Sequence, residues 1–240
     1  MTTLETLDYA DGSLALQGWL LEGDDGIGPV PGILVFPEFM GLGTYLVRHL
    51  EHLAGLGYVV LAADMYGKAI RPETAEAASM SCRPLRADRT AMRRRALAAF
   101  DRMRQLGHVD AQRIAAVGFS FGGCAALELA RTGAPLKGAA SFYGYLDTTL
   151  PAVAGTITAK LLVFHGMHDP IVPVSSLADY CQEMDAAGAD SRVVTYADAG
   201  HGFCNREMDG TKNSWNRYSR RHDQQSWQTL KAFLAEVLAG

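Results

Sequence analysis

The opening of the chain alternates hydrophobic and polar residues, whereas its later hydrophobic segments are short and continuous. Residues 4–10 and 13–22 both alternate, and Asp11-Gly12-Ser13 between them suits a tight turn, so the pair is predicted to form an antiparallel hairpin. Continuous apolar runs are typical of strands that are buried on both faces. Further strands are predicted at residues 33–36, 58–62, 114–117, 137–143, 161–165 and 191–196.

Between these strands, hydrophobic residues recur every three or four positions, which is typical of helices that pack along one face. Helices are predicted over residues 46–56, 88–106 and 174–187, after the strand at 114–117, and over a closing segment that carries Trp227, Leu230, Leu234 and Val237. Residues 68–87 show little periodicity and are expected to run over the surface. The polar segment 205–222 is expected to be a surface loop.

Arginines are concentrated on the helix predicted over residues 88–106. They are Arg89, Arg93, Arg94, Arg95, Arg102 and Arg104. An anion-binding face is one interpretation of this pattern. Because the chain has a formal net charge of −4, we interpret the arginines instead as the solvated surface of the helix.

Strands that alternate with helices of this length predict an α/β fold. The expected sheet is mostly parallel and doubly wound, with helices on both faces and the antiparallel hairpin at the N-terminus. The 240 residues contain no Pro/Ser-rich or charge-rich linker, so we expect a single domain over residues 1–240. Sheets of this kind bind ligands beyond the carboxyl ends of their strands.

Composition excludes several functional classes. Hydrophobic residues make up 48% of the chain and charged residues 20%, as in an ordinary soluble enzyme, and the acidic balance gives no reason to expect nucleic acid or an anionic membrane as partner. We see no signal peptide and no apolar run near the ~18 residues of a membrane span, so the expected location is the cytoplasm. The four cysteines, Cys82, Cys124, Cys181 and Cys204, lack zinc-site spacing and are expected to be reduced thiols.

The segment Gly118-Phe119-Ser120-Phe121-Gly122 joins a predicted strand to a predicted helix. A Gly-x-Ser-x-Gly motif alone occurs often in ordinary glycine-rich loops, but this strand–turn–helix context is the one that a nucleophile elbow requires. In such a turn the backbone of Ser120 is strained and its hydroxyl stands clear of the strand end. The N–H of Phe121 then points toward charge that develops on a bound carbonyl oxygen.

A nucleophilic serine needs a base and an acid, which this chain supplies in the order Ser120, Asp169, His201. Asp169 follows a predicted strand and suits an acid that orients an imidazole, although capping of the helix after it is the alternative. His201 lies between Gly200 and Gly202, whose flexibility lets a loop bring the ring over a neighbouring strand end.

A metal site at His165, His168 and Asp169 is an alternative reading of the same region. The spacing of the two histidines suits a metal on a helix, but this stretch is predicted to be a strand followed by a loop. We therefore expect no metal. We expect His165 to pack in the core and His168 to face solvent or the edge of the site.

With these pieces in place, the chain resembles the dienelactone hydrolase family from about residue 32 to its C-terminal helix. The resemblance is carried by Phe36-Pro37-Glu38-Phe39-Met40-Gly41, Ala63-Asp64-Met65-Tyr66-Gly67, the motif around Ser120, Phe142-Tyr143-Gly144, His165-Gly166 with Asp169-Pro170, and Ala199-Gly200-His201-Gly202-Phe203. It implies an α/β-hydrolase fold without a large cap domain, acting on small esters or lactones with no cofactor.

The resemblance also implies roles for individual residues. Ser120 matches the nucleophile, Asp169 the acid and His201 the base, while the N–H groups of Phe39 and Phe121 match the oxyanion hole. Glu38 matches a glutamate that, in the best-known members, helps a cysteine nucleophile to form its thiolate. A serine hydroxyl is too weakly acidic for that device, so here Glu38 is expected to hold the resting serine, to position a water or only to accept local hydrogen bonds.

The substrate is less closely defined. Relatives that bind a carboxylate-bearing lactone place an arginine where this chain has Asn205, and Arg206 is one step further. We expect Tyr143, Phe203 and Arg206 to bind substrate, with Arg71, Arg83 and Arg86 as other partners for a carboxylate. The partner is expected to be a small ester or lactone, and the protein a monomer or homodimer. A thioesterase or small-substrate peptidase on the same triad, and a non-catalytic ligand-binding homologue, remain the alternatives.

Overall fold

The computed structural model describes residues 4–23, 28–210, 213 and 215–239. The first three residues, where we looked for the start of a signal peptide, lie outside the described residues. So do residues 211, 212 and 214 of the predicted surface loop.

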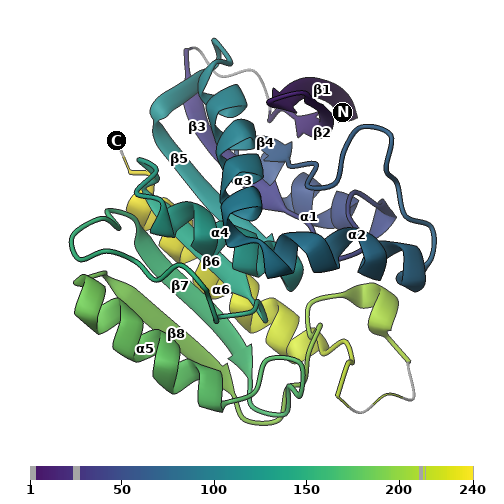
Figure 1. The fold of residues 1–240 in the computed structure, drawn as a ribbon, viewed down its shortest axis with the longest axis vertical. Helices are drawn as coiled ribbons and strands as arrows, with labels where there is room; N and C mark the ends of the chain where they lie inside the picture. The colour runs from purple at the N-terminus through teal and green to yellow at the C-terminus, as the bar shows by residue number, and fades with distance from the viewer. Residues whose placement is uncertain (1–3, 24–27, 211–212, 214, 240) are drawn as a thin grey trace.

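One eight-stranded sheet forms the centre of the fold (Figure 1). Its strands are β1 (Leu4–Asp11), β2 (Leu14–Leu21), β3 (Val30–Phe36), β4 (Val59–Ala62), β5 (Val109–Phe119), β6 (Gly138–Phe142), β7 (Lys160–Gly166) and β8 (Ser191–Tyr196), in the order β1-β2-β4-β3-β5-β6-β7-β8. β1 and β2 form the hairpin, with Asp11 opposite Leu14, and β2 pairs antiparallel with β4. All later pairs are parallel. The predicted mostly parallel α/β-hydrolase sheet with an N-terminal hairpin is confirmed.

Helices cover the sheet on both faces (Figure 1). They are α1 (Thr44–Ala54), α2 (Ala75–Ala87), α3 (Arg89–Arg104), α4 (Phe121–Arg131), α5 (Ser175–Ala187) and α6 (Arg220–Val237), with a short 3₁₀-helix η1 (Arg206–Met208). Leu34 and Phe36 of β3 join the hydrophobic core that includes α3, α4 and α5, whereas Ile33 and Val35 join the core that includes α1 and α6. Since successive side chains of a strand point to opposite faces, β3 is buried on both sides, which explains its apolar run. In the described parts of the chain, no helix has the length and apolar character needed to cross a bilayer.

Residues 68–87 lie largely at the surface, as predicted, but Ala75–Ala87 form the helix α2, which the sequence pattern did not predict. Thr74 caps this helix by accepting a hydrogen bond from the N–H of Ala77 at 3.2 Å. The buried side chains of α2 are Ala78, Cys82 and Leu85, two of them small. Hydrophobic periodicity did not predict this helix because only a small apolar surface of α2 packs against neighbouring elements.

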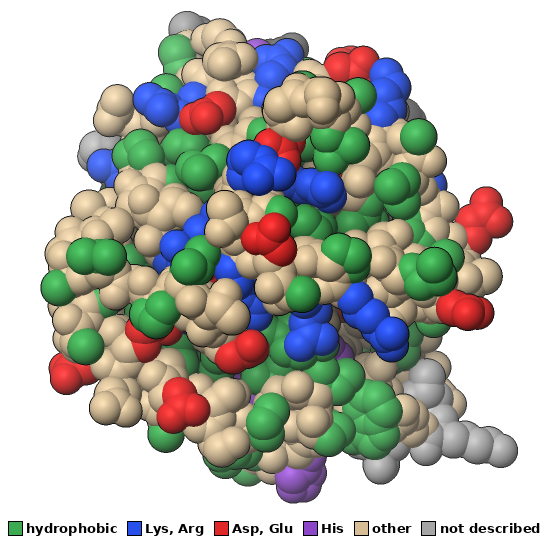
Figure 2. All heavy atoms as spheres, viewed as in Figure 1, with side chains coloured by type: hydrophobic (Ala, Val, Ile, Leu, Met, Phe, Trp, Pro, Cys, Tyr) green, Lys and Arg blue, Asp and Glu red, His purple; other side chains and the backbone are tan. Residues whose placement is uncertain are grey.

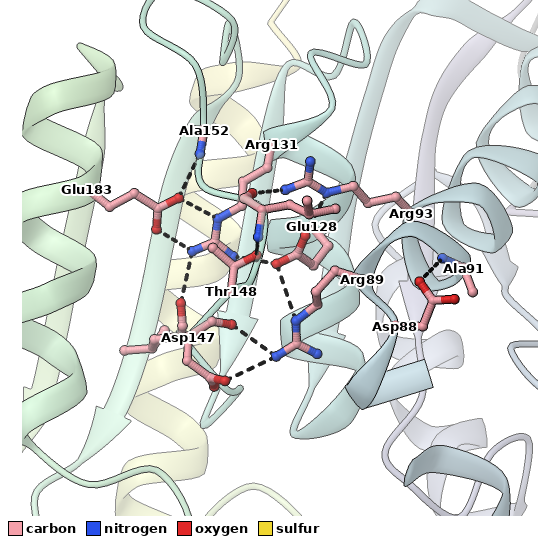
Figure 3. A network of polar contacts seen from close by, with 12 residues as sticks. Asp88, Arg89, Ala91, Arg93, Glu128, Arg131, Asp147, Thr148, Ala152 and Glu183 are labelled. Carbon is pink, nitrogen blue, oxygen red and sulfur yellow. Dashed lines mark hydrogen bonds and ion pairs between the residues drawn. The ribbon is translucent and has the colours of Figure 1, made fainter. Parts of the chain in front are cut away.

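The prediction that the arginines of α3 form a solvated surface was wrong for part of the set. Arg89 is 3% exposed, and the fully buried Glu128 of α4 accepts from Arg93 at 2.7 Å (Figure 3). Arg94 keeps an exposed side chain although it pairs with Asp11. The sequence signal was missed because the carboxylate that draws these guanidinium groups inward lies in another helix, more than 30 residues along the chain.

The polar segment 205–222 does not run over the surface throughout. Asn205 and His222 are both buried, at 4% exposure each, and α6 starts within the segment. Ser219 caps α6 by accepting from the N–H of His222. Polar composition therefore did not prevent burial, and the side chain of Asn205 is hydrogen-bonded inside the protein, to Glu38 and to the N–H of Glu207.

Candidate active site

The site lies at the carboxyl ends of the parallel strands, as expected. Ser120 sits between the last residue of β5 and the first of α4, with φ 51° and ψ −115°. Its backbone N–H donates to the carbonyl of Phe142 at 2.9 Å. A non-glycine residue with positive φ is strained, and this strain directs the side chain away from both the strand and the helix.

Two glycines permit the elbow by close approach of backbones. A Cβ atom added to Gly118 would lie 2.0 Å from the carbonyl oxygen of Gly122, and one added to Gly122 would lie 2.1 Å from that of Phe36. No side chain fits at either distance. The turn between β5 and α4 can therefore be this tight only with glycine on each side of the serine.

His201 reaches Ser120 from the segment after β8. Its Nε2 lies 2.8 Å from the hydroxyl oxygen of Ser120, and both side chains are buried, at 6% and 5% exposure. Its backbone N–H donates to the carbonyl of Trp215 at 2.6 Å, which fixes the loop. The imidazole is thus placed to exchange a proton with the hydroxyl.

Asp169 completes the line of contacts. One oxygen, Oδ2, lies 2.8 Å from Nδ1 of His201, and the other, Oδ1, accepts from the N–H groups of Ile171 and Val172 at 2.8 and 3.0 Å. α5 begins only at Ser175, so the alternative role of capping that helix does not apply. The structure brings together the three side chains that the sequence placed in the order Ser120, Asp169, His201.

Glu38 lies beside this line without joining it. Its Oε1 accepts from the hydroxyl of Tyr143 at 3.0 Å and its Oε2 from the amide of Asn205 at 3.1 Å. Glu38 is 8% exposed, and burial raises the pKa of its carboxyl, while His201 and the two donors act in the opposite direction. Of the roles expected for Glu38, the geometry matches acceptance of local hydrogen bonds.

Phe39 and Phe121, the expected oxyanion-hole residues, flank Ser120 on the wall of one cavity. Phe121 is the first residue of α4, where backbone N–H groups have no partner within the helix and carry partial positive charge. The carbonyl of Phe39 accepts from the hydroxyl of Tyr66 at 2.6 Å, which fixes this residue from behind. Both backbones are therefore held at the mouth of the elbow.

The cavity in front of Ser120 has a volume of about 350 Å³. Its lining residues are Glu38, Phe39, Ser79, Cys82, Arg83, Arg86, Ser120, Phe121, Tyr145, Ile171, His201, Met208, Trp215 and Asn216. Four of them come from α2, the helix that sequence periodicity missed. The guanidinium of Arg86 stacks 3.5 Å above the centre of the Tyr145 ring. Figure 2 shows that Lys and Arg side chains are concentrated on the face of the molecule that α2 and α3 cover.

The three residues expected to bind substrate are absent from the described lining of this cavity. Tyr143 and Phe203 are fully buried and pack against each other, ring centres 5.0 Å apart. The side chain of Arg206 is 58% exposed and lies 3.8 Å from Asp223. The sequence motifs around these three residues gave no information on where each side chain points, because that depends on the backbone of the loops that follow β6 and β8.

Of the other arginines considered, Arg83 and Arg86 line the cavity, whereas Arg71 pairs with Asp64 at 3.2 Å. His165 is buried, and burial lowers the pKa of its imidazole, while His168 is exposed. Among the described residues, no group of three or more His, Cys, Asp or Glu side chains is arranged to hold a metal ion.

Comparisons with known proteins agree with this architecture. The profile of the dienelactone hydrolase family matches residues 16–238. A probable 2-oxo-3-(5-oxofuran-2-ylidene)propanoate lactonase of Bradyrhizobium sp. is 28% identical over 81% of this chain and 85% of its own length. A putative carboxymethylenebutenolidase of Yersinia pestis is 26% identical over 78% and 74%.

Among solved structures, a dienelactone hydrolase-like promiscuous phosphotriesterase from metagenomic libraries superposes with a TM-score of 0.92 at 33% identity, over 99% of both chains. The family profile covers most of the chain, and the motifs that carried the resemblance follow the carboxyl ends of its strands. The protein belongs to the dienelactone hydrolase family, a family of hydrolases whose substrates are esters and lactones.

Proposed function

We propose that this protein hydrolyses small carboxylic esters or lactones with Ser120 as nucleophile, His201 as general base and Asp169 as the acid that orients it. The observation that carries the proposal is the pair of 2.8 Å contacts, from the Ser120 hydroxyl to His201 and from His201 to Asp169, at a strained elbow. A serine becomes a useful nucleophile only with such a base beside it.

In the proposed reaction, the hydroxyl oxygen of Ser120 attacks the carbonyl carbon as Nε2 of His201 takes the hydroxyl proton. Asp169 stabilises the resulting imidazolium, and the N–H groups of Phe39 and Phe121 bind the oxyanion. The tetrahedral intermediate then expels the alcohol, which receives the proton from His201, and leaves an acyl group on Ser120. In a lactone, this alcohol stays attached to the acyl chain.

Water completes the cycle. His201 removes a proton from a water molecule, whose oxygen attacks the acyl carbon, and the proton then returns to the oxygen of Ser120 as the acid leaves. One water is consumed for each ester bond that is broken. The cycle needs no oxidant, reductant or second substrate.

The cavity favours a small substrate that carries a negative charge. A volume of about 350 Å³ holds a compact acid or lactone, and its aromatic walls suit an apolar body. Arg83 and Arg86 add positive charge on the α2 side. The lactonase of Bradyrhizobium sp. has a name that includes a propanoate group, which agrees with a carboxylate-bearing substrate.

The first test replaces the nucleophile. Ser120→Ala should abolish hydrolysis of a short nitrophenyl ester and labelling by a fluorophosphonate probe, while thermal unfolding stays close to that of the wild type. Ser81→Ala is the matched control, because the Ser81 hydroxyl donates to the carbonyl of Ala77 on α2 and Ser81 is not among the residues that line the cavity.

Each outcome decides between specific alternatives. Turnover by Ser120→Ala near the wild-type rate would refute the proposed nucleophile. Failure of the folded wild type to react with the probe would favour a ligand-binding homologue. If the enzyme is labelled but prefers acyl-thioesters or short peptides in a substrate panel, the triad stands and the ester assignment falls.

A further inference from the structure

Glu38 is a buried carboxylate that the proposed reaction does not use. Its two oxygens accept from the hydroxyl of Tyr143 and the amide of Asn205, both neutral donors. In the described part of the chain, no Lys or Arg forms an ion pair with it. Its own backbone carbonyl accepts from the N–H of Gly41 at 2.9 Å, so the turn that carries Glu38 is tight.

Tyr143 links Glu38 to the imidazole. It follows β6 with φ 40°, a strained value for a residue with a side chain, and its N–H donates to the carbonyl of Phe164 at 2.8 Å. The ring that this backbone directs inward meets His201 edge to face, with ring centres 5.1 Å apart and planes at 64°. Tyr143 therefore touches the proposed base with its ring and Glu38 with its hydroxyl.

Asn205 links Glu38 to the loop of His201. Its N–H donates to the carbonyl of Gly202 at 2.8 Å, and its side-chain oxygen accepts from the N–H of Glu207 at 3.0 Å. Because the oxygen is engaged there, the amide nitrogen must face Glu38. The buried carboxylate thus fixes the segment that begins with His201.

On its own segment, Glu38 immediately precedes Phe39, whose N–H is a proposed oxyanion donor. The hydroxyl of Tyr66 holds the carbonyl of Phe39 from the other side, at 2.6 Å. Three loops, after β3, β6 and β8, consequently meet at the Glu38 carboxylate.

We infer that Glu38 is a positioning residue: with Tyr143 and Asn205 it forms a buried brace that fixes the oxyanion donor at Phe39 relative to the imidazole of His201. This inference rests on the proposed function. Transfer of the Ser120 proton to Glu38 is the competing role, but both Glu38 oxygens are occupied by other donors, whereas the Ser120 hydroxyl lies 2.8 Å from His201. Burial raises the pKa of Glu38, which agrees with a carboxylate that neutral groups must stabilise.

A double-mutant cycle between Glu38→Gln and Tyr143→Phe tests the brace. Each single variant should lower kcat roughly tenfold with little change in KM, because a misplaced donor weakens only the transition state. The double variant should be no slower than the slower single variant, since both changes break one unit. The fluorophosphonate labelling rate of Ser120 should fall by the same factor.

Tyr180→Phe is the matched control. Tyr180 is also buried and hydrogen-bonded, to Ser191 at 2.8 Å, but it belongs to α5 and is not among the residues that line the cavity at Ser120. Its loss should leave kcat unchanged even if stability falls.

Three results would overturn the inference. A proton-accepting Glu38 predicts that Glu38→Gln is far slower than Tyr143→Phe, that the acidic limb of the pH profile changes and that the two effects multiply. A purely structural role predicts lower thermal stability with unchanged kcat for both variants. If the wild type does not react with the fluorophosphonate probe and Ser120→Ala stays active, the proposed function is wrong and the brace is refuted with it. If the probe labels Ser120 but the effects of Glu38→Gln and Tyr143→Phe on kcat multiply, the brace alone is refuted.

Discussion

Two buried glutamates, Glu38 beside the proposed active site and Glu128 on α4, have hydrogen-bond donors of opposite kinds. Glu128 faces three guanidinium groups: Arg93 and Arg131 donate to it at 2.7 and 3.0 Å, and Arg89 lies 3.7 Å away (Figure 3). Within the described part of the chain, the Glu38 carboxylate accepts hydrogen bonds from a hydroxyl and an amide only. One carboxylate is surrounded by cations, whereas the other is surrounded by neutral dipoles.

The difference distinguishes a structural ion-pair cluster from a carboxylate that we infer to position the proposed active site. The cations around Glu128 also bind the loop after β6, since Arg89 donates to the carbonyl of Asp147 and Arg131 to that of Leu146, at 3.0 and 2.9 Å. Arg131 reaches Glu183 of α5 as well. This cluster ties α3, α4 and α5 together behind the elbow. Neutral donors at Glu38 place its carboxylate without adding a positive charge that would oppose a proton on His201.

The largest expected effect is the loss of stability when the Glu128 carboxylate is removed. In Glu128→Ala, the buried Arg89 and Arg131 lose the carboxylate that they share and keep Asp147 and Glu183 as their remaining ion-pair partners, so the free energy of unfolding should fall by about 3–5 kcal/mol. Denaturant unfolding measures the loss, and turnover per folded molecule should stay near that of the wild type. The exposed pair of Lys68 and Asp8 is the control, and Asp8→Ala should leave stability unchanged within error.

A loss of turnover in Glu128→Ala larger than the loss of folded protein would show that the arginine cluster supports the elbow directly. An unchanged unfolding free energy would show that the cluster is not a source of stability.

Arg86 differs from both glutamate sites, because it is a cation that forms no ion pair with a carboxylate of the described residues. It lines the cavity on the face of Tyr145, and its Nε is buried without a hydrogen-bond partner among the described residues. Arg86→Leu should raise KM for the hemisuccinate nitrophenyl ester about tenfold, the loss of roughly one charge-assisted contact. KM for nitrophenyl butyrate, of similar length but uncharged, should be unchanged. An equal rise for both esters would assign Arg86 to the shape of the wall.

The smallest expected effect is in the pH dependence of stability. Below the ordinary glutamate pKa of 4.5, Glu38 is protonated in both the folded and the unfolded chain, so no charge is buried on folding and the stability does not depend on this group's titration. As pH rises, the unfolded chain releases the proton first, and the wild type loses stability until the raised folded pKa is passed. Relative to Glu38→Gln, the wild type should therefore become less stable from acid toward neutral pH. Parallel unfolding curves across this range would contradict a raised pKa.

The sequence predicted the parts of the site whose signals are local. Ser120 was recognisable because both of its glycines stand within two residues, and His201 and Asp169 because each follows a predicted strand. The alternating hairpin and the apolar run in β3 likewise depend on neighbours along the chain, and their predicted arrangement in the sheet is confirmed.

What could not be predicted depends on contacts between distant segments. α2 was not predicted as a helix because only three of its residues are buried, so its hydrophobic pattern along the chain is weak. The burial of Arg89 required knowledge that Glu128 would face it from α4. The direction of Tyr143 depends on a strained backbone value at the end of β6, which no hydrophobic pattern encodes.

The 2.1 Å that would separate a methyl group on residue 122 from the Phe36 carbonyl has a consequence for how this protein can diversify. The turn that carries the proposed nucleophile is enclosed by main-chain atoms, which a substitution does not remove. The wall of the cavity, by contrast, is made of side chains, among them those of α2 and of Met208, Trp215 and Asn216, which substitution can change. Substitutions in that wall are therefore expected to change which molecule the cavity accepts while the turn at Ser120 keeps its geometry.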